Sequence, residues 1–372
     1  MKVVCDRAAL VEALALAGSV VPTRTNVKVL RSLAINAEDG LLTVAATNTD
    51  VDISIGVPQV EIQTPGKALI PSDKLNQIVR ACEDSTVSFE TDEKNHLVVR
   101  SEDAVFKLNG ADPKAFQGAK DFPENAENAF TCSASVLRTL IGRTLFAIAA
   151  ESSRFAISGV LVEKRGKQLR FVATDGRRLA VAIGDVEGGP EDETFILPSK
   201  PLQILNKLVD DPDATVSIVR DESQAIFRIG EGADAAVLST NLVEGKFPPF
   251  EDVIPKDQDK KVCFESSELG SAVRRAALLT NEESKGVRMN FSDDKLLLSS
   301  SASEMGEAEI QVELKSYQGE PIEIGFNPTY LTDALRVVDA PEIEIELKAP
   351  NKPGVMKVGS SFTYVVMPVN LT

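Results

Sequence analysis

A helical pattern of apolar residues occurs three times along the chain. In the first occurrence, over residues 70–83, apolar side chains recur at the helical period from Leu75 to Cys82, which predicts an amphipathic helix with one buried face. The pattern returns from Leu197 and from Phe326. A cation follows at one fixed place in each copy, at Arg80, Lys207 and Arg336. The repetition suggests a surface that faces one anionic partner, and the alternative is an ordinary solvated helix face.

The expected starts of these helices carry capping residues. Ser72 stands where an N-cap belongs, because its hydroxyl could accept a hydrogen bond from an unpaired first-turn amide. In the third copy Asn327 takes this place, and Pro328 opens the first turn, where a missing N–H costs little. We therefore expect side-chain caps at Ser72 and Asn327.

The rest of the pattern repeats as well. Each third opens with a strand and an amphipathic helix, anchored by Leu10, Leu137 and Leu269 in turn. Alternating apolar residues around polar turns follow and are typical of β-hairpins, and further strands follow the second helix. The chain therefore consists of three copies of one unit, with domains expected at 1–122, 129–255 and 256–372. The connections rich in Pro, Gly and charge, over 109–128 and 241–260, should be pinned to the surface.

Two amphipathic helices and several two-faced strands in each third predict an α+β domain, with helices on one side of an antiparallel sheet. Three such domains in a row would form a curved plate with the helices on one face. A second copy could continue the curve and join the sheets edge to edge, which would leave no strand edge open. The candidate closing positions are Phe106, Leu108, Leu278 and Leu279, and their alternative interpretation is ordinary core.

The charge balance restricts the possible partners. The chain has 40 basic and 56 acidic side chains, and its net charge of −16 would repel nucleic acid if it were spread evenly. The cations on the repeated helices indicate that the charge is uneven. An acidic exterior with a basic inner face satisfies both observations.

Cysteine use and hydropathy predict a cytoplasmic protein. The four cysteines show no CxxC spacing, and Cys5 and Cys132 occupy equivalent places in two repeats, so both are expected as small core residues in a reducing compartment. No apolar run approaches 18 residues, and the first residues lack the plan of a signal peptide. We expect no contact with a membrane.

Catalytic signals are weak. Glycines over 229–237 resemble a GxGxxA motif, but a strand is expected after them, so they predict a hairpin turn. His96 has no metal-ligand companion and is expected at the surface. Asp175 has no paired base, nucleophile or metal cluster, and the equivalent repeat positions, Asn48 and Ala302, are not acidic. The sequence therefore predicts no enzyme, no cofactor and no metal.

Five segments together carry a resemblance to a known family. They are SSRFAISGVLVE (152–163), ATDGRRLA (173–180), EGKFPPFEDVIP (244–255), NEESKGVRM (281–289) and the terminal YVVMPVNLT. In this order and spacing the chain resembles, over its whole length, the bacterial DNA sliding clamps, the beta subunits of DNA polymerase III. The resemblance implies a head-to-tail homodimer: a closed ring of six like domains, sheets outside and helices inside, around duplex DNA. Such a ring holds a polymerase on its template by topology and has no catalytic activity.

The resemblance assigns cations to a lining that contacts DNA without sequence preference. A sliding protein needs diffuse attraction to phosphate, since specific base contacts would each cost about 1–3 kcal/mol per step. The expected lining residues are Arg24, Lys74, Arg80, Arg143, Arg154, Lys200, Lys207, Arg275 and Arg336.

The resemblance also implies a pocket in which polymerases, the clamp loader and other proteins insert a short peptide rich in Gln and Leu. Aliphatic side chains and an adaptable Met suit Leu and Phe anchors, while Arg178 would bind the polar end and Gly176 would allow a tight turn. Without the family, this segment would predict only a hairpin turn. The matched residues are Ile157, Thr174, Gly176, Arg178, Leu179, Pro248, Val253, Tyr330, Val365, Met367, Pro368, Val369 and Leu371.

The chain departs from the family pattern around this pocket. Arg177 stands where a His is usual, and Asp252 stands where an Arg is usual. At the C-terminus Val369 replaces a Met and Asn370 replaces an Arg, with Thr372 added. Two cations are thus lost and one is gained, which predicts an altered preference or affinity for peptides.

Two further hypotheses are open at this point. The chain could be a protein-docking scaffold of the same triplicated fold that binds no DNA, with incidental charges on its helices. It could also be a hydrolase or transferase that uses Asp175. Retention on circular DNA and release after linearisation would separate a clamp from a scaffold.

Overall fold

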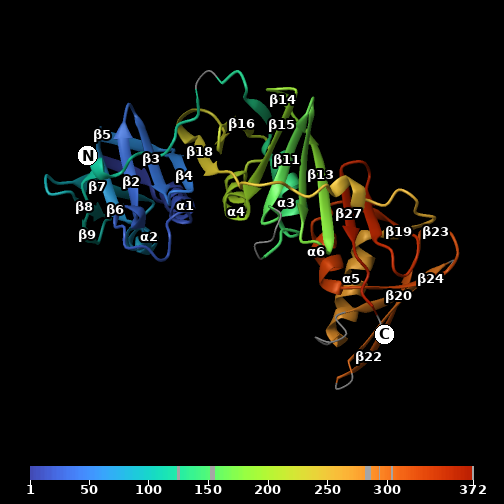
Figure 1. Cartoon of the computed structure of the whole chain (residues 1–372). Coiled ribbons are helices and arrows are strands. Elements are labelled where there is room, and N and C mark those ends of the chain that lie inside the picture. The colour runs from blue at the N-terminus through green and yellow to red at the C-terminus, as the bar shows by residue number, and fades with distance from the viewer. Residues whose placement is uncertain (124–125, 151–155, 281–285, 293, 303–304, 371–372) are drawn as a thin grey trace. The chain divides into compact units, whose positions relative to one another are not determined.

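The computed structural model describes residues 1–123, 126–150, 156–280, 286–292, 294–302 and 305–370 (Figure 1). The chain divides into two compact units. The first contains Met1–Arg138, Val186–Pro190 and Lys200–Leu242. The second contains Thr139–Asp185, Glu191–Ser199 and Val243–Thr372. Arg154, Leu371 and most of the motif 281–289 lie outside the described residues.

The first unit is built from two antiparallel sheets. The five-stranded sheet has the order β5 (Val60–Thr64), β1 (Lys2–Asp6), β7 (Thr86–Thr91), β8 (His96–Arg100) and β9 (Val105–Asn109). The nine-stranded sheet has the order β14 (Glu187–Gly188), β10 (Phe130–Ser133), β16 (Thr215–Asp221), β17 (Gln224–Ile229), β18 (Ala236–Asn241), β4 (Val51–Val57), β3 (Leu41–Thr47), β2 (Ser32–Glu38) and β6 (Gly66–Pro71). Its helices include α1 (Arg7–Gly18) and α2 (Ser72–Ala81), which pack together, and nearly all of α4 (Ser199–Leu208).

The second unit also has two antiparallel sheets. The nine-stranded sheet has the order β15 (Asp192–Pro198), β11 (Gly159–Arg165), β12 (Gln168–Thr174), β13 (Arg178–Asp185), β27 (Phe362–Val366), β26 (Gly354–Val358), β25 (Glu342–Leu347), β19 (Lys260–Glu265) and β23 (Ser316–Gln318). The four-stranded sheet has the order β22 (Gly306–Glu313), β21 (Lys295–Ala302), β20 (Val287–Phe291) and β24 (Ile322–Phe326). Helices α5 (Ser266–Ala276) and α6 (Pro328–Arg336) pack against each other, and α3 (Ala134–Leu145) contributes its C-terminal part.

The predicted hairpins and helices are confirmed. The first hairpin of each third forms from β2 and β3, from β11 and β12, and from β20 and β21. The predicted helical stripe buries Leu75 and Val79 fully, because these positions share one face of α2. Glycines over 229–237 lie in the turn between β17 and β18, as the hairpin interpretation predicts.

One of the two predicted caps is wrong. Asn327 caps α6 as predicted, because its Oδ1 accepts a hydrogen bond from the Thr329 N–H at 2.9 Å. At α2 the N-cap is Pro71, which makes no side-chain hydrogen bond. Ser72 is buried inside the first turn, where its Oγ accepts a hydrogen bond from the Asn76 side chain at 3.4 Å. Its hydroxyl therefore faces a side chain in place of the first-turn amides.

The first connection lies against the sheet, as its composition predicts. The guanidinium of Arg228 lies 4.7 Å from the ring centroid of Phe122, and Lys120 Nζ is 3.3 Å from an Asp221 carboxylate oxygen. The side chain of Asn128 donates a hydrogen bond to the carbonyl of Arg220 at 3.1 Å. These contacts tie the connection to β16 and β17.

The predicted core cysteines are buried. Cys5 lies on β1 and Cys132 on β10, each inside the core of the first unit. Burial raises the pKa of both thiols to about 12, with a further contribution from the charge of Asp6 at Cys5. Both are therefore protonated near neutral pH. In the part of the chain that the structure describes, no helix is long and apolar enough to cross a membrane.

One pairing rule holds in both nine-stranded sheets. The last strand of the middle third, β18, pairs with β4, the third hairpin strand of the first third. The last strand of the chain, β27, pairs in the same way with β13, the third hairpin strand of the middle third. The equivalent strands that remain are β9, the last strand of the first third, and β22, the third hairpin strand of the last third. Each is the end strand of its own sheet.

Candidate functional site

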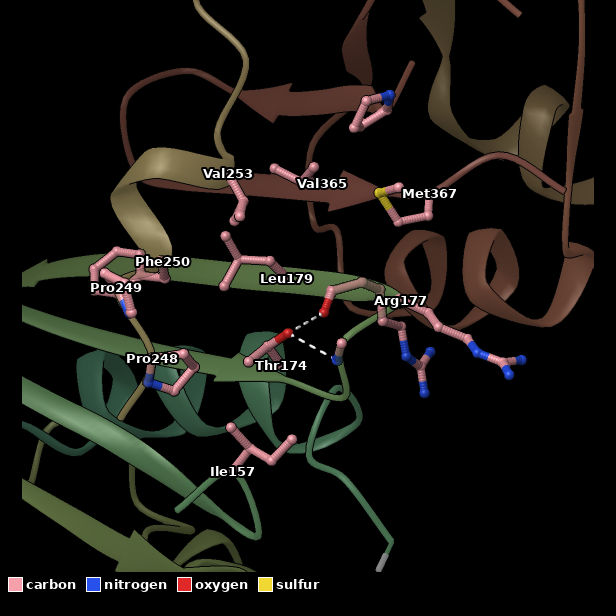
Figure 2. A pocket seen from close by; sticks show the side chains of 13 residues that line it. Ile157, Thr174, Arg177, Leu179, Pro248, Pro249, Phe250, Val253, Val365 and Met367 are labelled. Carbon is pink, nitrogen blue, oxygen red and sulfur yellow. Dashed lines mark hydrogen bonds between the residues drawn. The ribbon is translucent and has the colours of Figure 1, made fainter. Parts of the chain in front are cut away.

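The second unit contains an apolar pocket with a volume of about 470 Å³ (Figure 2). Its walls come from the turn between β12 and β13, from the segment around η4 (Phe250–Val253) and from the end of β27. The lining residues are Ile157, Thr174, Gly176, Arg177, Arg178, Leu179, Pro248, Pro249, Phe250, Val253, Pro353, Val365 and Met367.

The floor of the pocket is part of a packed core. Leu179 and Val365 lie opposite each other in the ladder between β13 and β27, and both belong to a buried cluster with Phe250. At the rim, Val253 is 55% exposed and Met367 is 44% exposed. Figure 2 shows Val253 close to Leu179 and Val365, with Met367 toward one end. Apolar side chains with this much exposure leave surface that a ligand could cover.

The turn between β12 and β13 is held by its own side chains. Thr174 Oγ1 donates to the carbonyl of Arg178 at 2.7 Å and accepts from the Gly176 N–H at 3.1 Å. One carboxylate oxygen of Asp175 accepts from the N–H groups of Arg177 and Arg178 at 2.9 and 3.1 Å. Gly176 has a φ of 85°, in the left-handed region that favours glycine. Asp175 is thus a structural residue of this turn, which gives no support to a catalytic role.

Arg178 connects this turn to two other elements. Its Nε donates to Asp175 at 3.0 Å, and its terminal nitrogens donate to Asp333 of α6 at 2.8 Å and to the carbonyl of Phe146 at 2.7 Å. The guanidinium also lies 4.5 Å from the ring centroid of Tyr330. Burial opposes its charge, but the hydrogen bond to Asp333 and the neighbouring groups raise the pKa of Arg178 above its ordinary value. Because these donors are engaged within the protein, Arg178 positions the turn, and its predicted contact with a peptide stays a prediction.

A second arginine, absent from the sequence predictions, holds the opposite wall. Arg170 on β12 donates to Glu163 of β11 at 3.3 Å and to Glu251 of η4 at 3.0 Å. Its guanidinium lies 6.0 Å from the ring centroid of Phe250, a lining residue. Arg170 therefore ties η4 to the sheet. The alternating pattern of β12 places it outside the core but does not reveal its partners, which come from other segments.

The structure brings together nine of the thirteen predicted pocket residues: Ile157, Thr174, Gly176, Arg178, Leu179, Pro248, Val253, Val365 and Met367. Tyr330, Pro368 and Val369 are not among the lining residues. Tyr330 lies beneath Arg178, and the Val369 N–H donates to the carbonyl of Gly325 at 2.9 Å. Four lining residues were not predicted: Arg177, Pro249, Phe250 and Pro353. The adjacent prolines and Phe250 were visible in the motif FPPFEDVIP, whereas Pro353 comes from a distant turn.

The repeated cations are exposed at equivalent places. Arg80, Lys207 and Arg336 each lie in the last turn of their helix, where the helix dipole also favours a positive charge. The predicted lining residues Arg24, Lys74 and Lys200 are exposed as well. Arg336 is 3.4 Å from a carboxylate oxygen of Asp333 and remains largely exposed. All six side chains are accessible to an anionic partner, although Lys74 also donates to Gln77 Oε1 at 3.3 Å.

Among the predicted lining residues, Arg143 differs from the expectation. Arg143 on α3 is only 9% exposed, and its guanidinium donates to Ser361 Oγ at 3.0 Å and lies 5.4 Å from the ring centroid of Phe362. Burial lowers the pKa of Arg143, an effect that the charge of Asp339 partly offsets. The prediction that Arg143 lines a DNA channel is therefore not supported, because its side chain is used inside the protein. The equivalent Arg275 is exposed and lines a separate pocket between α5 and β22, and its place in the DNA lining stays a prediction.

The predicted closing positions lie at or near sheet edges. Phe106 and Leu108 are half-buried on the edge strand β9. Leu278 is 75% exposed and Leu279 is half-buried in the short helix η5 (Ala277–Leu279), directly after α5. The described residues contain no group of three or more His, Cys, Asp or Glu side chains that could hold a metal ion.

Three family models match the chain in tandem. The N-terminal domain of the DNA polymerase III beta subunit matches residues 1–120, the central domain matches 131–249 and the C-terminal domain matches 251–370. The fold is thus three tandem clamp domains, of α+β type, as predicted from the repeats.

Whole-chain relatives agree. A beta sliding clamp of Pseudomonas putida is 32% identical, with 98% of this chain and 99% of the relative covered, and one of Vibrio cholerae is 30% identical with both chains fully covered. Among solved structures, a Pseudomonas aeruginosa sliding clamp (DNA polymerase III subunit beta) bound to griselimycin is 31% identical with a TM-score of 0.89, both chains fully covered. A Bacillus subtilis sliding clamp is 25% identical with a TM-score of 0.91, again over both full chains. This chain belongs to the beta sliding clamp family, the processivity factors of DNA polymerase III.

Proposed function

We propose that two copies of this chain close head to tail into a ring around duplex DNA, and that the ring carries polymerase, clamp loader and other proteins through the apolar pocket. The three domains of each copy would span 1–122, 129–255 and 256–372. The ring would have no catalytic activity, cofactor or metal, and would work in the cytoplasm without contact with a membrane.

The pairing rule of the nine-stranded sheets is the observation that carries this proposal. Leu238 of β18 lies opposite Ile53 of β4, and Tyr364 of β27 lies opposite Ala180 of β13. Phe106 of β9 occupies the ladder position of Leu238 and Tyr364, and Ala308 of β22 occupies that of Ile53 and Ala180. The same rule would therefore place Phe106 opposite Ala308. Both strands are sheet edges, so this pair would join two copies.

The same register pairs opposite charges. One position further along, Lys107 of β9 would lie opposite Glu307 of β22. The exposed side chains of Leu278 and Val105 would add apolar area at the same junction. Each copy offers one edge of each kind, so two copies satisfy all four edges and close.

The proposed DNA contact is electrostatic. A net charge of −16 repels DNA from most of the surface, while the exposed cations at the ends of α2, α4 and α6 attract phosphate. Contacts of this kind carry no sequence information, so the ring could slide without breaking base-specific bonds.

Replacing Arg80, Lys207 and Arg336 together with alanine is expected to weaken DNA binding and to reduce its salt dependence. The slope of log affinity against log salt is negative, with about one unit for each phosphate contact. If all three side chains contact phosphate, their removal should make this slope shallower by about 3 for each chain. Fluorescence anisotropy with a duplex at several salt concentrations measures both quantities. The matched control replaces Lys67, Lys94 and Lys295, three exposed lysines outside the helices, and should change neither. Equal effects of the two triple variants would reject the proposed lining.

The pocket is proposed as the docking site because its walls offer aliphatic side chains and a flexible Met, with the polar side chains of Thr174, Arg177 and Arg178 beside them. A short extended peptide with Leu and Phe anchors fits this chemistry. The solved Pseudomonas aeruginosa relative is described as bound to griselimycin, which shows that a related clamp takes a ligand.

Primer extension tests the proposed function. With the cognate polymerase and clamp loader and a single-encounter trap, adding this protein should lengthen the products, whereas a polymerase without its clamp-binding peptide should gain nothing. Product lengths that do not depend on this protein would contradict a processivity role. The alternative of a protein-docking scaffold that binds no DNA would then remain.

A further inference from the structure

A polar pocket of about 440 Å³ lies between α5 and the edge strand β22. Ser267, Ser271 and Arg275 line it from α5, and Gln311 and Glu313 line it from β22. Of the described residues that line it, Arg275 is the one cation, beside the carboxylates of Glu268 and Glu313. The pocket opens along the edge at which a second copy is proposed to add a strand.

The middle third shows what occupies the equivalent place. Arg143 is the repeat equivalent of Arg275, since each stands six residues after the anchoring leucine of its helix, Leu137 and Leu269. Arg143 reaches the turn before β27, where it donates to Ser361 Oγ at 3.0 Å. The carbonyl of Ser361 accepts a hydrogen bond from the Ile183 N–H of β13 at 2.9 Å. A turn of the following repeat thus lies between the helix arginine and the edge of β13.

Strand register identifies which residue before the edge strand β9 corresponds to Ser361 before β27. Val105 of β9 and Thr363 of β27 are equivalent, because each pairs with the basic residue of the preceding strand, Arg100 and Lys357. Two residues before them stand Asp103 and Ser361.

The counterpart of Ile183 follows in the same way. Leu179 of β13 and Glu307 of β22 are equivalent, because they lie opposite Thr174 and Ser301 of the preceding strands. Four residues further along each strand stand Ile183 and Gln311. Gln311 lines the pocket that holds Arg275.

We propose that Arg275 of one copy forms an ion pair with Asp103 of the other, inside the pocket between α5 and β22. The inference rests on the proposed head-to-tail dimer and gives Arg275 the role that Arg143 has within the chain. The carbonyl of the entering Asp103 would accept a hydrogen bond from Gln311, as Ser361 does from Ile183. Arg275 is therefore a residue of the subunit interface and not of the DNA lining.

The charges around the pocket make Arg275 necessary for this contact. Asp103 would enter beside Glu268 and Glu313, so three carboxylates would lie together without a cation if Arg275 were removed. In the chain itself Asp103 is exposed, and among the described residues its carboxylate accepts a 3.3 Å hydrogen bond from the Ser101 hydroxyl, which leaves it accessible to a second copy. An ion pair between two subunits whose charged groups come close together and lose their water can increase the affinity of the dimer.

Charge reversal in the full chain tests the pair. Arg275→Glu should raise the dimer dissociation constant at least about tenfold in sedimentation velocity, and more at low salt than at high salt. Asp103→Arg alone should also weaken the dimer, and Arg275→Glu combined with Asp103→Arg should restore most of the loss, because both junctions of the ring then carry the reversed pair. Arg274→Glu, the neighbouring exposed arginine of α5, is the matched control and should leave the dimer unchanged.

The outcomes separate the pair from the dimer. If the unmodified chain dimerises but Arg275→Glu does not weaken it, or the double variant does not recover, the ion pair is wrong and the head-to-tail dimer stands. If the unmodified chain remains monomeric at every concentration tested, the dimer itself is wrong. Circular dichroism of each variant confirms that the compared proteins are folded.

Discussion

Replacing Arg178 with alanine is expected to lower the free energy of unfolding by about 3 to 5 kcal/mol and to remove binding of clamp-binding peptides. The guanidinium is 10% exposed and joins Asp175, Asp333 and the carbonyl of Phe146. Without it, the largely buried carboxylate of Asp175 loses its ion pair, and Asp333 is left with the longer 3.4 Å contact to Arg336. Leaving such carboxylates poorly paired costs more than the ion pairs contribute when intact. Urea unfolding followed by circular dichroism measures the stability, and isothermal titration with a Leu- and Phe-containing peptide measures binding.

Arg177 provides the matched control for this prediction. It stands next to Arg178 in the same turn, but its side chain is exposed. Arg177→Ala should change the free energy of unfolding by less than about 0.5 kcal/mol. If both substitutions had the same small effect, the buried pairs of Arg178 would not stabilise the turn or the pocket.

Replacing Val253 and Met367 together with alanine is expected to weaken peptide binding about 10- to 100-fold and to leave the fold intact. The two side chains approach the pocket from η4 and from the end of β27, and both are exposed, so truncating them opens no cavity in the core. Together, two apolar anchors of this kind contribute about 1.4–2.8 kcal/mol when a peptide covers them, which corresponds to this loss. Titration with the same peptide gives the affinity, and urea unfolding should give an unchanged midpoint.

Val27→Ala is the control for this pair. Val27 is comparably exposed but belongs to the first unit and does not line the pocket. It should leave peptide affinity unchanged. Normal affinity in the double variant would place peptide binding elsewhere on the protein.

The elements of the fold were predictable because they depend on local periodicity. The stripe at Leu75 and Val79 and the cap at Asn327 follow from spacing and from side chains within a few residues. Ser72 shows the limit of this approach. Its hydroxyl is buried beside Asn76 of the same helix, and the Asn76 side chain also donates to the carbonyl of Leu14 in α1 at 3.3 Å. The packing of α2 on α1 therefore competes with the capping preference of serine.

The candidate site was only partly predictable, because its walls come from segments distant in the sequence. The turn that contains Gly176 could be placed from its motif, but Pro353 and the bridge from Arg170 to Glu251 appear only when β12, η4 and the turn before β26 meet. Arg143 shows the opposite error. Its helical position matches an exposed cation by spacing. Its side chain is nevertheless buried against Ser361 and Phe362, at the turn that leads into β27, more than two hundred residues away in the sequence.

The measurement that tests the central claim most directly is retention on DNA of defined topology. The protein is loaded onto a nicked circular plasmid with the clamp loader, separated from free protein by gel filtration, and the DNA is then cut once with a restriction enzyme. A closed ring should stay with the circle through the column at moderate salt and leave the linear molecule by sliding off its ends. Equal retention on circular and linear DNA, or no retention on either, would contradict a ring that encircles the duplex.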